Sequence, residues 1–262
     1  MNMTLLAILA ATLLAGVGSV WLAALLGFGI LARYTQHMLS LAAGALLATA
    51  FMHLLPEAFE SQVGADQLFP TLLVGLIFFF LLDKAELWHH GHEHHHGHDH
   101  SHDHADSQAP ARPGGSWAIL TGDSVHCFGD GVLIASAFVA DIRLGVVAAL
   151  AVLMHEVPHH MGDLAVLRQA SDNRRMALVK VSLAGGLTAL GGVVGFFLVA
   201  QLEAYLPYFL AIASSSFLYV ALADLIPQLQ KKLSARETLA QIVWLAVGMG
   251  MVTLASSLTH SH

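Results

Sequence analysis

Long apolar stretches separated by short polar segments dominate the chain. Each is about 20 residues or more, enough to cross the roughly 30 Å hydrocarbon core of a membrane as a helix. Apolar and polar positions do not alternate, so strands are not expected, whereas helices satisfy their backbone hydrogen bonds inside lipid. The pattern predicts an all-α polytopic membrane protein, a single transmembrane domain over 1–262, with eight transmembrane helices at 3–31, 38–60, 68–88, 116–139, 144–169, 177–200, 205–228 and 238–259.

Composition excludes several other classes of protein. Hydrophobic residues make up 56% of the chain and charged residues 11%, against roughly 25% charged in an ordinary soluble domain. So few charges cannot cover a soluble globular surface, and so many apolar residues do not suit a disordered chain. A single cysteine excludes an internal disulfide. With 11 Lys and Arg and a net charge of −7, we expect no nucleic-acid partner. The apolar composition instead indicates that the chain lies in a lipid bilayer.

The basic residues predict the orientation in the membrane. Arg33 is the first of them and follows the first apolar stretch, so we expect that stretch to be a membrane span and not a cleaved signal peptide. With the N-terminus outside, the inner loops hold every Lys and Arg except Arg143. Because basic residues favour cytoplasmic loops, we predict that both termini are extracytoplasmic.

One long polar segment, 89–115, separates the third and fourth predicted helices. It carries the run WHHGHEHHHGHDHSHDH, which holds ten of the 18 histidines. Neutral imidazole binds zinc, copper, nickel and ferrous iron, and histidine-rich tracts indicate metal binding. The run is internal and interrupted, unlike a purification tag. We predict a flexible cytoplasmic loop that buffers or hands on metal ions.

Ionisable residues gather in the fourth and fifth predicted helices, and inside a membrane such residues are functional candidates. His126 and Asp130 lie one turn apart, and His155 and His159 have the same spacing. Each helix therefore presents two donors on one face. His126 and His155 both fall about ten residues from the start of their helix, roughly 15 Å deep and near the midplane. Two facing helices with four such donors predict a divalent-metal site.

A second metal position is expected beside the first. Glu156 and His160 form another pair one turn apart, rotated by one residue around the fifth helix, and Cys127 is rotated in the same way on the fourth. Asp130 is the expected bridge between the two positions. The alternative is a buried polar network that only ties the helices together.

Further polar residues in the spans predict a transport pathway. His53 and Glu57 lie toward the outer end of the second predicted helix, and Asp123 and Asp163 lie inward of the midplane histidines. Asp224 lies near the inner end of the seventh helix, where it also fits a helix-end anchor. In this order they lead from outside, past the midplane site, to the histidine-rich loop.

These motifs resemble the ZIP family of divalent-metal transporters, in the subgroup whose fifth helix carries HExPHExGD. The match in the fifth helix consists of His155, Glu156, Pro158, His159, Gly162 and Asp163. The companion HNxxDG motif is matched by His126, Asp130 and Gly131. The segments HLLPEA at 53–58 and FLYVALADLIP at 217–227 are also similar to that subgroup.

The resemblance implies import into the cytoplasm, without ATP, of zinc or a similar ion such as iron, manganese or cadmium. The metal would be the substrate, and no separate cofactor is expected. It also implies a central, often binuclear site, a homodimer and a multi-pass location in the plasma membrane, such as a bacterial inner membrane. Two residues depart from the motif, since Cys127 replaces Asn and His160 replaces the second Glu. Softer donors are expected to favour zinc or cadmium over manganese.

Three rival functions fit parts of the sequence. The run 155–159 reads HExxH, the pattern of a zinc metalloprotease, but it contains a proline and lies beside other ligand candidates. The HxxxD spacing of His126 and Asp130 also occurs in cation-diffusion exporters, which resemble six spans followed by a cytoplasmic domain. A metal sensor would need a soluble output domain. We therefore expect a transporter that is not an enzyme.

Overall fold

The computed structural model describes residues 3–91, 113–170, 174–230 and 234–260, so most of the predicted histidine-rich loop lies outside the described residues. Within the described ranges the chain contains helices and no strand, which confirms the all-α prediction. Eight helical segments are long and apolar enough to cross a membrane, and each overlaps one predicted span. They are Met3–Leu26, Tyr34–Phe59, Ala65–Leu82, Asp123–Ala140, Ile142–Leu164, Arg174–Gln201, Glu203–Leu229 and Ala235–Ser256.

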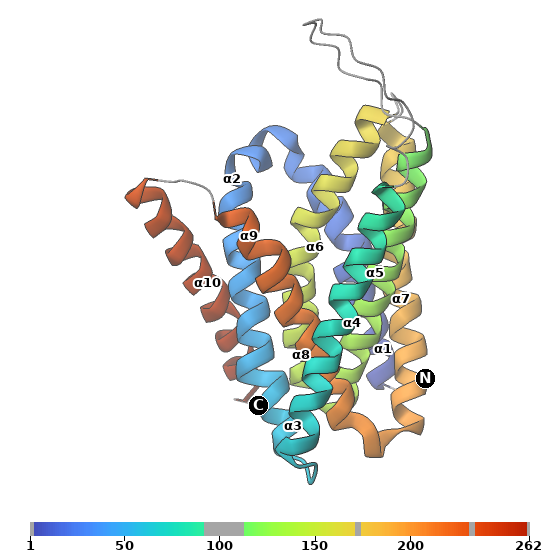
Figure 1. The fold of residues 1–262 in the computed structure, drawn as a ribbon, viewed down its shortest axis with the longest axis vertical. Coiled ribbons are helices and arrows are strands. Elements are labelled where there is room, and N and C mark those ends of the chain that lie inside the picture. Colours follow the sequence, from blue (N-terminus) through green and yellow to red (C-terminus); the bar gives the residue numbers. More distant parts are fainter. Residues whose placement is uncertain (1–2, 92–112, 171–173, 231–233, 261–262) are drawn as a thin grey trace, which may run out of the picture.

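Several spans combine more than one helical element. The long α-helices are α1 (Met3–Leu13), α2 (Ser19–Thr49), α4 (Ala65–Gly91), α5 (Pro113–Ala140), α6 (Ile142–Ala170), α7 (Arg174–Gln201), α8 (Leu206–Tyr219) and α10 (Ala235–His260). The short elements are π-helical η1 (Leu14–Gly18), η2 (Ala50–Leu54) and η4 (Val220–Leu225), 3₁₀-helical η3 (Glu203–Tyr205), and α3 (Leu55–Phe59) and α9 (Ile226–Leu229). The helix α2 contributes to the first two spans and bends back at the upper end of the bundle (Figure 1).

The helices form an elongated bundle in which α5 packs against α7 and α6, and α2 packs against α6 and α10 (Figure 1). The N- and C-terminal ends lie on the lower side of the view with α3, whereas α9 and the C-terminal end of α4 lie toward the upper side. An even number of spans places the two termini on one side. By the predicted orientation, the upper end is the cytoplasmic one.

Glycines let α5 and α7 approach to backbone contact. A Cβ at Gly131 would collide with the carbonyl oxygen of Thr188, and a Cβ at Gly191 would collide with that of Phe128. Small residues at such positions let membrane helices pack closely. This contact helps to fix the rotation of α5, and in this rotation the donor atoms of His126 and Cys127 reach Glu156 on α6.

Two π-helical turns each precede a proline by two residues. Pro56 follows η2, which carries His53, and Pro227 follows η4, which carries Asp224. Proline has no N–H to donate, so it weakens the regular hydrogen-bond ladder before it. Such π-bulges often occur at functional sites. Here they place both predicted pathway residues in widened turns of two different spans.

Candidate metal centre

Four donors from α5 and α6 converge in a first cluster, formed by His126, Asp130, His155 and Glu156. The Nε2 atom of His155 lies 3.1 Å from Asp130 Oδ2 and 3.4 Å from His126 Nε2. Glu156 Oε1 lies 3.3 Å from His126 Nε2 and 3.4 Å from His155 Nε2. Three of these residues are buried and His126 is partly exposed. The set is mixed imidazole and carboxylate, which suits a divalent metal.

A second cluster lies beside the first and is wholly buried. It consists of Asp123, Cys127, Glu156 and His160. Glu156 Oε2 lies 3.1 Å from His160 Nε2 and 3.6 Å from Cys127 Sγ, and Cys127 Sγ lies 3.5 Å from Asp123 Oδ1. This arrangement brings together the three residues that the sequence assigned to a second position.

Glu156 stands between the two clusters, with Oε1 facing the first and Oε2 facing the second. The sequence favoured Asp130 as the bridge, but the structure groups Asp130 with the first cluster only. The reason is helical rotation. Glu156 follows His155 directly and so projects about 100° further around α6, and its two oxygens then point in different directions.

Two histidines present Nε2 to the clusters because Nδ1 is held elsewhere. His155 Nδ1 lies 3.2 Å from the carbonyl oxygen of Ala151, which can only accept, so Nδ1 carries the hydrogen. His160 Nδ1 lies 2.9 Å from Ser19 Oγ, and that hydroxyl donates its hydrogen to the Gly16 carbonyl at 2.6 Å. The Ser19 oxygen therefore accepts from His160 Nδ1. In both rings the Nε2 lone pair is left for a metal.

Sequence reasoning missed Ser19. The residue lies 141 positions before His160, in an apolar span, and no motif connects the two. The available signal was a small polar residue within LAGVGSVWL, because serines in membrane helices often bond across helix interfaces.

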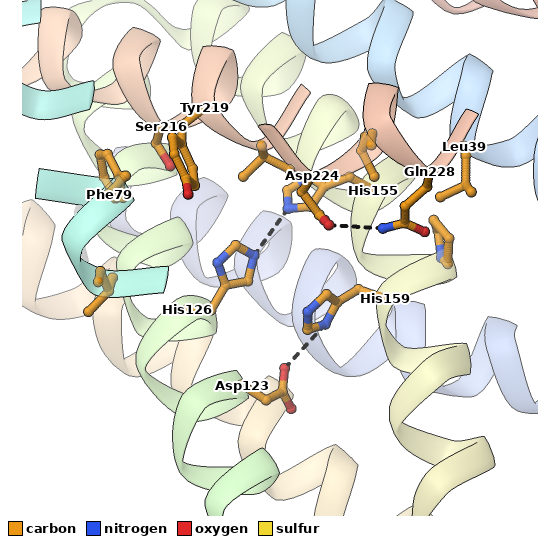
Figure 2. A pocket seen from close by; sticks show the side chains of 14 residues that line it. Leu39, Phe79, Asp123, His126, His155, His159, Ser216, Tyr219, Asp224 and Gln228 are labelled. Carbon is orange, nitrogen blue, oxygen red and sulfur yellow. Dashed lines mark hydrogen bonds and ion pairs between the residues drawn. The ribbon is translucent and has the colours of Figure 1, made fainter. Parts of the chain in front are cut away.

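The sequence predicted that His159 would belong to the first cluster, but in the structure it lies outside that cluster. Its Nδ1 atom lies 3.6 Å from Asp123 Oδ1 and 3.4 Å from Asp163 Oδ2. These three residues form a third group of donors. The His159 ring stacks on that of His126, with centroids 5.3 Å apart and planes inclined by 27°. In Figure 2 it points toward Asp123.

A cavity of about 150 Å³ opens onto the centre from one side (Figure 2). Its lining includes His126, His155 and His159, and also Asp224, which accepts a 2.8 Å hydrogen bond from Gln228. The structure thus places Asp224 in the same cavity as these three histidines. The half-buried Pro158 lines the same cavity. The helix α6 continues past this proline without a break.

His53 and Glu57 lie away from the clusters. They line a separate cavity of about 400 Å³ near α3, together with Asp141 and Arg143 at the start of α6. The two cavities share no lining residue. Between them, α6 carries the fully buried Ala148, Ala151 and Val152.

Several buried carboxylate oxygens at the centre have no hydrogen-bond partner among the described residues. They are Asp123 Oδ2, Asp130 Oδ2, Glu156 Oε1 and Asp163 Oδ2. Asp130 Oδ2 faces the lone pair of His155 Nε2, so two acceptors point at each other. Buried carboxylates are costly unless a cation compensates them. The donors therefore fit a divalent cation, and oxygen, imidazole and thiol together suit zinc.

Eight apolar helices around buried donor clusters define a polytopic membrane protein with a candidate metal centre. Residues 83–256 match the family model described as ZIP Zinc transporter, and the chain belongs to this family. The resemblance inferred from the sequence motifs is confirmed.

Curated relatives agree with the family match. Over 243 residues the chain is 28% identical to zinc transporter ZIP13 of Pongo abelii, covering 86% of this chain and 68% of that protein. Over 258 residues it is 30% identical to zinc transporter ZIP4 of Homo sapiens, covering 78% of this chain and 40% of that protein. Over 140 residues it is 34% identical to zinc transporter foi of Drosophila melanogaster, covering 53% and 20%. The chain thus spans less than half of the latter two proteins.

Proposed function

We propose that this chain carries divalent transition-metal ions, zinc foremost, across a membrane into the cytoplasm without ATP. The observation that supports this most directly is the convergence of buried acceptors around Glu156, whose two oxygens face two sets of donors. Buried acceptors that face one another are stabilised by a cation or a proton between them, and a divalent metal ion can serve several of them at once. The family match and the zinc transporters among its relatives support a transported metal rather than a structural one.

The two cavities support a direction of movement. The smaller one joins the clusters to Asp224, toward the end that we predict to be cytoplasmic. The larger one holds His53 and Glu57 at the opposite end. On α6, eight residues or about 12 Å separate Val147 in one cavity from His155 in the other, and apolar side chains fill the interval. In this state an ion has access from the cytoplasmic side, and transport requires that interval to open.

The proteolysis alternative is less well supported. A metalloprotease uses the glutamate of HExxH as a general base beside an open metal position. Here both oxygens of Glu156 face other donors, and Asp130 contributes to the same cluster as His126 and His155. This leaves little room for the catalytic water and substrate that such a zinc site keeps open.

Zinc uptake into proteoliposomes tests the proposal. Wild-type protein should take up radioactive zinc down its gradient, saturably and without nucleotide, and His126→Ala/His155→Ala should abolish uptake. His37→Ala is the matched control, because it removes a membrane-span imidazole that packs on Tyr34 and Trp244, away from the clusters. Absence of uptake by wild-type protein that still binds zinc would overturn transport and favour sensing or proteolysis.

A further inference from the structure

His159 and two carboxylates form a donor group of their own on the cytoplasmic side of the centre. Its three members are Asp123 on α5 and His159 and Asp163 on α6. His159 Nδ1 faces Asp123 Oδ1 at 3.6 Å and Asp163 Oδ2 at 3.4 Å. His159 and Asp163 are one turn apart, so the group lies on one face of α6 and closes against α5.

The burial of the group differs from that of the other clusters. Asp123 and Asp163 are only 4% and 9% exposed, whereas the side chain of His159 is 38% exposed and lines the cavity toward Asp224. The second cluster, by contrast, is wholly buried. An ion at His159 would therefore retain access to water from the cavity, with buried carboxylates behind it.

Each carboxylate of this group has one oxygen that accepts no hydrogen bond from the described residues. Asp163 Oδ2, the atom that faces His159, has no hydrogen-bond partner among the described residues, and neither does Asp123 Oδ2. Each of the two buried carboxylates therefore keeps one oxygen without a hydrogen-bond partner among these residues. A divalent cation would compensate both charges at once, and three protein donors leave coordination positions for water.

Asp123 links this group to the second cluster. Its Oδ1 atom lies 3.6 Å from His159 Nδ1 and also 3.6 Å from His160 Nε2, and 3.5 Å from Cys127 Sγ. An ion that leaves the buried cluster thus meets the next donors without losing this carboxylate. Figure 2 shows Asp123 and His159 pointing toward one another at the wall of the cavity.

We propose that Asp123, His159 and Asp163 form a third divalent-metal position, which receives the ion as it leaves the buried pair of clusters. This inference rests on the proposed transport function and adds an exit step to it. Of the three residues, Asp163 contributes to this group alone, whereas Asp123 also belongs to the second cluster. Substitution of Asp163 therefore addresses the third position without touching the other two.

Zinc binding to the purified full-length chain in lipid nanodiscs tests the position. At a saturating zinc concentration, Asp163→Asn should bind one zinc ion fewer per chain than wild-type protein. Asp163→His, which restores a donor, should recover that ion. Glu203→Gln is the matched control, since it removes an exposed carboxylate in η3. Thermal unfolding of each variant identifies loss of fold.

Uptake of zinc into proteoliposomes provides the second readout. Asp163→Asn should lower uptake by about tenfold, within the range that loss of a metal-orienting group costs, and Asp163→His should restore most of it. Wild-type zinc stoichiometry in folded Asp163→Asn would overturn the third position, even if wild-type transport stands. So would loss of all zinc binding by the folded variant, because Asp163 would then belong to a common site. Absence of wild-type uptake would refute the proposed function, while the stoichiometry would still decide the third position.

Discussion

Replacement of Ser19 by alanine tests how the second cluster is prepared for metal. Ser19 and His160 are both fully buried, and the Ser19 oxygen accepts the hydrogen of His160 Nδ1 at 2.9 Å. Alanine would leave that N–H buried without an acceptor. The ring can escape only by moving its hydrogen to Nε2, the nitrogen that faces Glu156 at 3.1 Å. The nitrogen needed for metal would then be blocked.

The size of the effect follows from the burial. A buried donor without a partner costs about 1–3 kcal/mol, which corresponds to about 5- to 150-fold in binding. Removal of groups that orient metal-binding histidines costs about 10- to 100-fold in affinity, and the two ranges overlap. We therefore expect the affinity of the second cluster for a thiophilic ion to fall by about tenfold or more in Ser19→Ala, since both ranges include that value.

Cadmium titration measures this cluster selectively, because a metal–thiolate bond to Cys127 absorbs in the ultraviolet. The matched control is Ser40→Ala, which removes another buried hydroxyl of α2 that donates to a carbonyl of its own helix, that of Gln36, at 2.8 Å. Equal cadmium affinity in wild-type protein, Ser19→Ala and Ser40→Ala would refute the reasoning. So would a Ser19→Ala variant that unfolds at lower temperature but binds cadmium as wild type does, because Ser19 would then act only in packing.

Two further predictions concern selectivity and pH. Cys127→Asn combined with His160→Glu replaces soft donors by oxygen donors, so uptake of manganese relative to zinc should rise in competition assays; an unchanged ratio would contradict the role of these two residues. Zinc affinity, measured by equilibrium dialysis, should fall as pH is lowered from about 7 to about 5, the interval in which free imidazole takes up a proton. Ligating histidine and cysteine must be deprotonated, so protons compete with the metal, and affinity independent of pH would count against these ligands.

The sequence was sufficient to predict the membrane spans and the helix faces on which the candidate donors lie. Apolar length alone defines a membrane helix, and spacing of one turn puts His126 with Asp130 and Glu156 with His160 on common faces. Apolar length and one-turn spacing do not predict which donor belongs to which cluster. His155 and His159 share a face, yet their rings turn toward different carboxylates. That choice depends on how α5 and α6 are rotated against each other, which the α5–α7 glycine contacts help to fix.

The order of the donors along the membrane axis, in contrast, follows from chain direction alone. The helices α5 and α6 run in opposite directions, so residue numbers fall along α5 and rise along α6 toward the same end. Asp123 lies about 4.5 Å beyond His126, and Asp163 about 12 Å beyond His155, at 1.5 Å per residue. Both steps lead away from the cavity of His53 and Glu57, which α5 reaches at Ala140 and α6 at Val147. Since Glu156 is shared by the first two clusters and Asp123 by the second and third, each step along this axis keeps one carboxylate in common. An ion would then stay bound to one carboxylate while it exchanges its other donors, and it would not have to be fully stripped of ligands inside a medium in which a bare charge is prohibitively costly.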